Sequence, residues 1–160
     1  MRSLALLSAI AAGFALGLAE ASEHWGGLVP CALCLVERWP YRVAIALSLI
    51  AFAVPRQLAR WLLVLTVLTI LVGAAFAFVH VGVELHFWPS PLPECAAPSL
   101  GSGSIAERLA QMPARPAKPC DAPTFLIPGI PLSMAAMNLI YAMVFVAALT
   151  IGLWRKWRTA

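Results

Sequence analysis

The chain has 160 residues, of which 62% are hydrophobic and only 11% are charged, and its formal net charge at pH 7 is +4. Soluble domains carry about 25% charged residues, so this composition argues against an ordinary water-soluble protein and favours one surrounded by lipid. The excess of basic residues does not indicate nucleic-acid binding, because these residues lie at the ends of apolar runs and form no basic stripe.

Four apolar runs follow one another along the chain. They are Leu4–Ala19, a run from the first cysteine pair to Val54, Trp61–Val79 and Leu132–Trp154. A helix of about 20 residues crosses a hydrocarbon core, and lipid offers the backbone no partners outside a helix or a closed barrel. We therefore predict an all-α membrane protein, one integral domain over 1–160. Its four-transmembrane-helix bundle should have helices at about 3–20, 32–54, 60–80 and 131–154.

The first of these runs has a second interpretation. Residues 1–21 combine a basic start, an apolar middle and the sequence Ala19-Glu20-Ala21, which is typical of a cleaved signal peptide. Cleavage would leave the sidedness of the remaining chain unchanged. We favour an uncleaved helix, because the segment is long and four helices pack better than three.

Lys and Arg predict the orientation of the bundle, since they gather on the cytoplasmic side of membrane proteins. Basic residues precede the first run, separate the second from the third, and follow the fourth: Arg2, Arg56, Arg60, Arg155, Lys156 and Arg158. Both termini are therefore predicted to be cytoplasmic. The loops at about 21–30 and 81–130 are then on the opposite side, together with all four cysteines: Cys31, Cys34, Cys95 and Cys120.

The stretch His80–Pro131, which holds the long second loop, contains ten of the thirteen prolines, and prolines limit regular structure. Between the proline clusters, Ser104 and Glu107 have the spacing of a helix capping box. Ile105, Leu109 and Met112 would share one face of such a helix. We expect a short amphipathic helix here, which either lies on the membrane surface or packs within the loop without touching lipid.

Two of the cysteines form a CxxC pair at the start of the second predicted helix. A disulfide between Cys31 and Cys34 would close a very small loop and stabilise the fold little. A helix N-terminus stabilises a thiolate, so this arrangement is typical of redox sites. Cys95 and Cys120 could instead form a structural disulfide, although four cysteines allow three pairings. The alternative of a metal site has weak support, because His24, His80 and His86 show no ligand spacing.

Arg38 follows Cys34 by four residues, so the two side chains should share a helix face. An arginine in the first turns of a membrane helix is costly unless it faces protein, water or the interface. Arg38 could lower the pKa of the Cys34 thiol or hold a polar ligand atom. The alternative, for Arg38 and Arg42 alike, is that the side chain extends to lipid head groups. Glu37 points elsewhere and could pair with another helix.

Several features together resemble the bacterial DsbB disulfide-bond formation proteins. They are the four spans, the motif CxLCxxER at Cys31–Arg38 opening the second helix, two further cysteines in a long loop, and PSPLPEC at Pro89–Cys95. The resemblance covers nearly the whole chain. It implies a quinone-dependent protein-disulfide oxidoreductase of the bacterial inner membrane, with its active face in the periplasm. Such an enzyme reoxidises a DsbA-like periplasmic thiol oxidase and passes the electrons to ubiquinone or menaquinone.

The resemblance also implies a role for each site residue. Cys95 would form the mixed disulfide with the partner, and Cys120 would then attack Cys31. Cys34 would be released as the thiolate that reduces the quinone, with Arg38 beside both. The family can place a histidine near the quinone, and we favour His80 because it ends the third predicted helix. We assign no metal ligands.

Two other functional classes remain open at the level of sequence. Vitamin K epoxide reductase-like enzymes also combine a membrane CxxC, loop cysteines and a quinone, but their CxxC usually lies later in the bundle. The other class is a non-enzymatic membrane protein whose cysteines bind a metal or connect loops.

Overall fold

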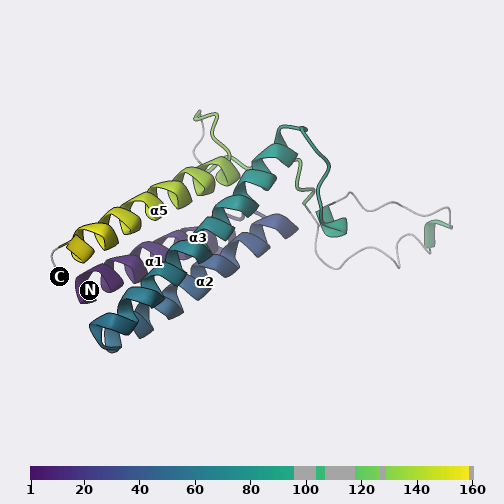
Figure 1. The fold of residues 1–160 in the computed structure, drawn as a ribbon. Helices are drawn as coiled ribbons and strands as arrows, with labels where there is room; N and C mark the ends of the chain where they lie inside the picture. The colour runs from purple at the N-terminus through teal and green to yellow at the C-terminus, as the bar shows by residue number, and fades with distance from the viewer. Residues whose placement is uncertain (96–103, 107–117, 127–128, 159–160) are drawn as a thin grey trace.

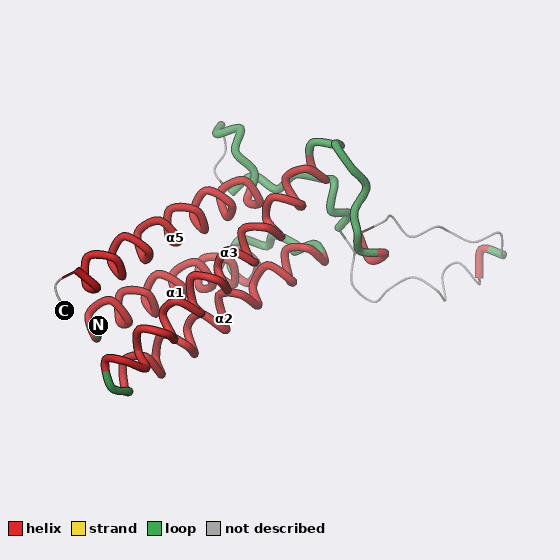
Figure 2. The backbone as a smooth tube through the Cα atoms, viewed as in Figure 1, coloured by secondary structure: helices red, strands yellow, loops and turns green. Residues whose placement is uncertain are grey.

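The described part of the chain is all-helical in the computed structural model, which describes residues 1–95, 104–106, 118–126 and 129–158. Its elements are α1 (Arg2–His24), α2 (Ala32–Ala53), α3 (Arg56–Glu84), the short 3-10 helix η1 (Pro93–Cys95) and α5 (Met134–Arg158). Within these ranges no strand is formed, apart from an isolated bridge between Phe125 and Ser133 (Figure 2). Most of the expected amphipathic loop helix, from 107 on, lies outside the described residues.

The four long helices lie side by side as a bundle, with both termini at one end (Figure 1). The main helix pairs in contact are α1 with α2, α2 with α3, and α3 with α5. Small residues make up much of the core: Ala5, Ala12, Ala44, Ala51, Ala59, Ala74 and Ala142. They let the backbones approach closely, as is usual between helices in lipid. A hydrogen bond of 2.9 Å between Ser8 and Ser48 joins α1 to α2 inside this core.

The outer surface of the bundle is apolar. Among the described helices, α1, α3 and α5 are long and apolar enough to cross a membrane. Large side chains point outward from each of them, for example Leu7, Phe78 and Val144, which are 57–63% exposed. Such a surface suits lipid and would be unfavourable in water. Helix α2 differs because it carries Glu37, Arg38 and Arg42 in its first three turns.

The helix ends differ from those expected from the apolar runs. α3 begins at Arg56, where about 60 was expected, because Pro55 is its N-cap and the preceding Val54 is extended, as residues before proline usually are. α3 also continues to Glu84. His80 therefore lies within α3, one turn before its end, and the expectation that it ends the helix was wrong. α1 likewise continues to His24, so the first loop is shorter than predicted.

Gly82 allows the loop after α3 to fold back onto the helix. A Cβ atom at position 82 would lie 1.9 Å from Cζ2 of Trp88, whose indole N–H donates to the carbonyl of Val79 at 3.0 Å. We expect Gly82→Ala to lower the free energy of unfolding by about 1–3 kcal/mol, because the rigid indole must move. Thermal unfolding in detergent would measure this. Gly13→Ala is the matched control, since a Cβ there meets nothing within 4 Å; equal melting temperatures for both variants would contradict the prediction.

Candidate functional site

Cys31 and Cys34 lie together at the N-terminus of α2. Cys31 is the N-cap residue, and its sulfur accepts a hydrogen bond of 3.3 Å from the backbone N–H of Cys34. The two sulfurs are 2.8 Å apart, and both cysteines are free. The helix dipole favours negative charge at this position. A small rotation about the side-chain bonds would bring the sulfurs to bonding distance, so the pair is placed to alternate between dithiol and disulfide.

The thiol of Cys31, just before the first residue of α2, is more acidic than an ordinary cysteine thiol. The hydrogen bond from the Cys34 thiol has the largest influence and lowers the pKa of Cys31 below its ordinary value, and backbone N–H groups act in the same direction. Burial and the nearby Glu37 carboxylate oppose this effect. The thiolate is the reactive form in disulfide exchange, so a lowered pKa makes Cys31 a better leaving group from a disulfide that is attacked at the other sulfur.

His80 connects the thiols to a buried polar network. Its Nε2 lies 3.4 Å from the Cys31 sulfur, and its Nδ1 lies 2.7 Å from Oε1 of Glu37. The other carboxylate oxygen of Glu37 accepts a hydrogen bond of 2.6 Å from Asn138, whose Oδ1 accepts one of 2.6 Å from Tyr41. The network joins α2, α3 and α5, so the orientation of the imidazole is fixed by three helices.

A second carboxylate lies near His80 on the same helix. Oε1 of Glu84 is 4.0 Å from Nε2 of His80. Its other oxygen accepts a hydrogen bond of 2.5 Å from Ser133. Ser133 precedes α5, and its hydroxyl also accepts from the backbone N–H of Ala136 at 3.2 Å, as in an N-cap. These contacts attach the start of α5 to the end of α3 that carries His80.

Arg38 is held by α1. Its guanidinium lies 2.7 Å from Glu23 and 3.3 Å from Glu20, and it donates to the carbonyl of Ala19 at 3.4 Å. The side chain is only 9% exposed, so these partners offset the cost of burying its charge. Arg42, one turn further, is 45% exposed, pairs with Glu20 and lies over the Trp39 ring.

A cavity of about 380 Å³ lies beside these groups. Its walls are mainly apolar, with Phe14, Leu18, Leu126 and Met134 among them, and a few polar groups converge on it: Cys34, Arg38, Tyr41, His80 and Asn138. Mainly apolar walls with a few placed polar groups are typical of small-molecule sites. The cavity therefore offers N–H donors and a thiol to a mainly apolar molecule with acceptor oxygens.

The other two cysteines form a disulfide, Cys95–Cys120. It is buried in one apolar cluster with Cys31, Leu33 and Val83, while Cys34 packs at the edge of the same cluster. Cys95 also lines a second hollow of about 410 Å³, together with Trp88 and Asp121 among others. The two sulfur pairs are therefore neighbours: Cys34 lines the apolar cavity, and Cys95 lines the second hollow.

The structure brings together most of the residues that the sequence singled out. Cys34, Arg38 and His80 line one cavity, and Cys31 touches two of them. His86 lies apart, exposed and with a left-handed backbone (φ 59°) in the turn after α3. Sequence reasoning missed Asn138, Tyr41 and Glu84. Asn138 had one available signal, because it is the only amide side chain in its apolar run.

Comparisons with known proteins identify a family and one relative. The family described as Disulfide bond formation protein DsbB matches residues 1–152. The chain is also similar to an uncharacterized protein of Rickettsia prowazekii (strain Madrid E), RP370. The two are 33% identical over 128 residues, covering 79% of this chain and 72% of that protein. No solved structure matches the chain.

Proposed function

Because the chain belongs to the DsbB family of membrane disulfide oxidoreductases, we propose that it reoxidises a DsbA-type dithiol oxidase and delivers the electrons to membrane quinone. One observation carries this proposal: the dithiol of Cys31 and Cys34 lies between the Cys95–Cys120 disulfide and an apolar cavity. Family membership also favours this function over the vitamin K epoxide reductase-like alternative.

The proposed electron path is a series of thiol–disulfide exchanges. A thiolate of the partner attacks Cys95, which breaks the bond to Cys120 and leaves a mixed disulfide. The partner's second thiol then displaces Cys95, so that the partner gains a disulfide and Cys95 and Cys120 become thiols. Cys120 next attacks Cys31 of the oxidised CxxC pair and releases Cys34 as a thiolate. Each exchange transfers two electrons and needs contact between the sulfurs, which the shared cluster supports.

Cys95 then attacks Cys120, which re-forms the loop disulfide and releases Cys31, so that Cys31 and Cys34 are left as a dithiol. The cycle closes when these two sulfurs form their disulfide again and give up two electrons and two protons. A quinone, when bound, supplies an acceptor for two electrons and two protons. In this proposal Cys34 faces the acceptor, because it lines the cavity. Arg38 stabilises the Cys34 thiolate and donates to an acceptor oxygen, and Glu20 and Glu23 orient the guanidinium. His80, held by Glu37, is positioned to donate or accept a proton beside the thiols.

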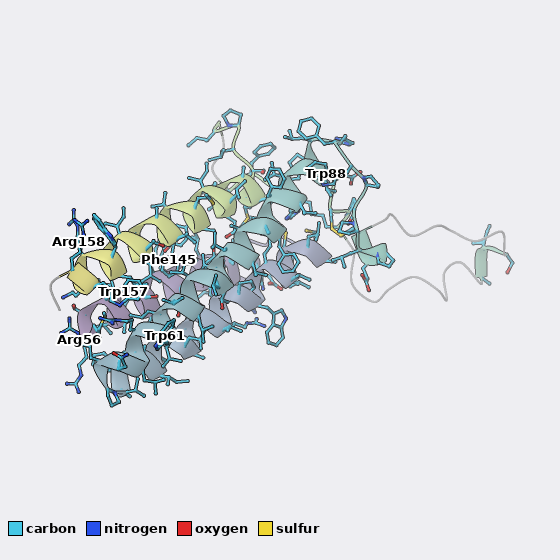
Figure 3. The ribbon with its side chains drawn as sticks, viewed as in Figure 1. Arg56, Trp61, Trp88, Phe145, Trp157 and Arg158 are labelled. Atoms are coloured by element: carbon cyan, nitrogen blue, oxygen red, sulfur yellow. A yellow bond between two sulfur atoms is a disulfide. The ribbon has the colours of Figure 1, made fainter. Side chains whose placement is uncertain are left out.

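We further propose that all four helices span the bacterial inner membrane, with the cysteines on the periplasmic face. The charged side chains of α2 have partners on neighbouring helices, which supports α2 as a membrane span in addition to α1, α3 and α5. Arg56, Trp157 and Arg158 lie at the end of the bundle with the termini, and Trp88 lies at the other end (Figure 3). Basic residues at the first end favour the cytoplasmic side.

An enzyme assay tests the proposed function. Purified protein in lipid nanodiscs, a reduced DsbA-type protein and a short-chain ubiquinone should give quinone reduction. One quinone should be consumed for each partner disulfide formed. The loss of quinone absorbance and the alkylation state of the partner measure the two quantities. Partner oxidation that needs no quinone, or no oxidation at all with either ubiquinone or menaquinone, would overturn the proposal.

A further inference from the structure

Three ligand atoms with high affinity for zinc converge beside the cavity. The sulfurs of Cys31 and Cys34 and Nε2 of His80 all lie within 4.8 Å of one another. Tetrahedral zinc, with bonds of about 2.3 Å to sulfur and 2.0–2.1 Å to nitrogen, separates its ligand atoms by about 3.5–3.8 Å. The contact of 3.4 Å between Cys31 and His80 is close to this value, and the sulfurs, at 2.8 Å, need to separate by only about 1 Å.

The surroundings of these atoms are those of a metal site. Zinc-binding histidines usually donate their second ring N–H to a carboxylate, which fixes the ring and leaves the other nitrogen free to bind. Here Nδ1 of His80 lies 2.7 Å from Glu37, so Nε2 is the nitrogen that faces the thiols. The sulfur of Cys31 also accepts a backbone N–H hydrogen bond from Cys34, an interaction that supports a negatively charged ligand.

Charge and burial also fit a divalent ion. Cys31 and His80 are only 3% and 2% exposed, and a buried net charge would be unfavourable. Two thiolates balance the charge of Zn²⁺, so the exchange of two thiol protons for one ion leaves the net charge of the site, Glu37 included, unchanged. Cys34 and His80 both line the cavity, which leaves a fourth coordination position open to a water molecule.

We propose that the dithiol form of this protein binds one Zn²⁺ through Cys31, Cys34 and His80, and that the bound ion blocks turnover. Binding forms two Zn–S bonds and releases two protons, with no change of oxidation state. The disulfide form has no thiolates and does not bind. The inhibition rests on the proposed function, because sulfurs bound to zinc cannot take part in disulfide exchange. The zinc binding itself does not depend on the proposed function. The proposal also revises the expectation from sequence that the chain has no metal ligands.

The test uses the full-length protein, reduced with a phosphine and titrated with Zn²⁺ alone. After desalting, elemental analysis should give one zinc per chain for the reduced protein and none after oxidation of the CxxC pair. Cobalt in place of zinc should give the visible absorption of tetrahedral thiolate coordination. His80→Gln should weaken binding more than 100-fold, and Glu37→Gln about 10–100-fold, as is usual for a group that orients a ligand.

His86→Gln is the matched control, since His86 is exposed and outside the cluster. It should bind zinc like the unchanged protein. Zinc binding that is equal in the His80→Gln and unchanged proteins, or that persists after CxxC oxidation, would overturn the inference. Binding is measured without partner or quinone, so it is independent of the proposed function. If the protein turns over but zinc neither binds nor inhibits, only the zinc inference fails. If zinc binds but the protein does not turn over, only the proposed function fails.

Discussion

Replacing Cys34 with serine is expected to lower the rate of quinone reduction by about 10³-fold or more, the scale seen when a covalent nucleophile is removed. Of the four cysteines, only Cys34 is among the described residues that line the apolar cavity. Cys31 is buried and does not line it. A serine hydroxyl stays protonated at neutral pH and forms no disulfide. Without a Cys31–Cys34 disulfide, Cys120 has no bond to attack, so the electrons would stop at the Cys95 and Cys120 thiols and not reach the quinone.

The same assay of quinone absorbance measures this effect. Circular dichroism and a mass measurement of the Cys95–Cys120 disulfide should show an unchanged fold. Met143→Ser is a useful control, because it removes a sulfur from an exposed position on α5 and should leave the rate within a factor of two or so. Turnover in Cys34→Ser equal to that of the control would exclude Cys34 as the exit point for electrons.

The helices could be predicted because lipid imposes a simple requirement. A backbone in hydrocarbon must satisfy its own hydrogen bonds, so long apolar runs become helices. The ends were less accurate, because hydropathy marks the apolar part of a helix and not where its hydrogen bonds stop. α3 continues through His80 to Glu84, polar residues that a hydropathy pattern assigns to a loop. Their partners, Glu37 and Ser133, are distant in sequence.

In the site, too, contacts between residues close in sequence could be predicted and contacts between distant residues could not. Cys31, Cys34 and Arg38 belong to one helix start, so their spacing alone predicts that they lie together. The contact of His80 with Cys31 joins residues 49 apart, and that of Glu37 with Asn138 joins residues 101 apart. Such pairs depend on which helices are neighbours and on their rotation, which the periodicity of a nearly uniform apolar sequence does not determine. The pairing of Cys95 with Cys120 was likewise one of three possibilities from sequence.

Glu37→Leu is expected to lower the free energy of unfolding by about 3 kcal/mol, the sum of two hydrogen bonds to a buried charged group. Glu37 is 6% exposed, and its two oxygens bind His80 and Asn138. Leucine has a similar volume but accepts no hydrogen bond, so both partners would remain buried without an acceptor. The position of His80 would also be lost, and zinc affinity and turnover should decrease with stability. Chemical denaturation in detergent micelles would measure the change.

The isosteric variant separates shape from charge at this position. Glu37→Gln can still accept from His80, but its amide N–H₂ would face the donor of Asn138, so a smaller loss of about 1–2 kcal/mol is expected. Glu94→Leu is the matched control, because Glu94 is exposed, and its effect should stay within about 0.5 kcal/mol.

Combining Glu37→Leu with Asn138→Leu removes both members of one hydrogen bond. The double variant should therefore be more stable than the sum of the single effects predicts, by about 1 kcal/mol or more. Strictly additive losses would mean that Glu37 and Asn138 act independently, and the network would then not be what joins α2 to α5.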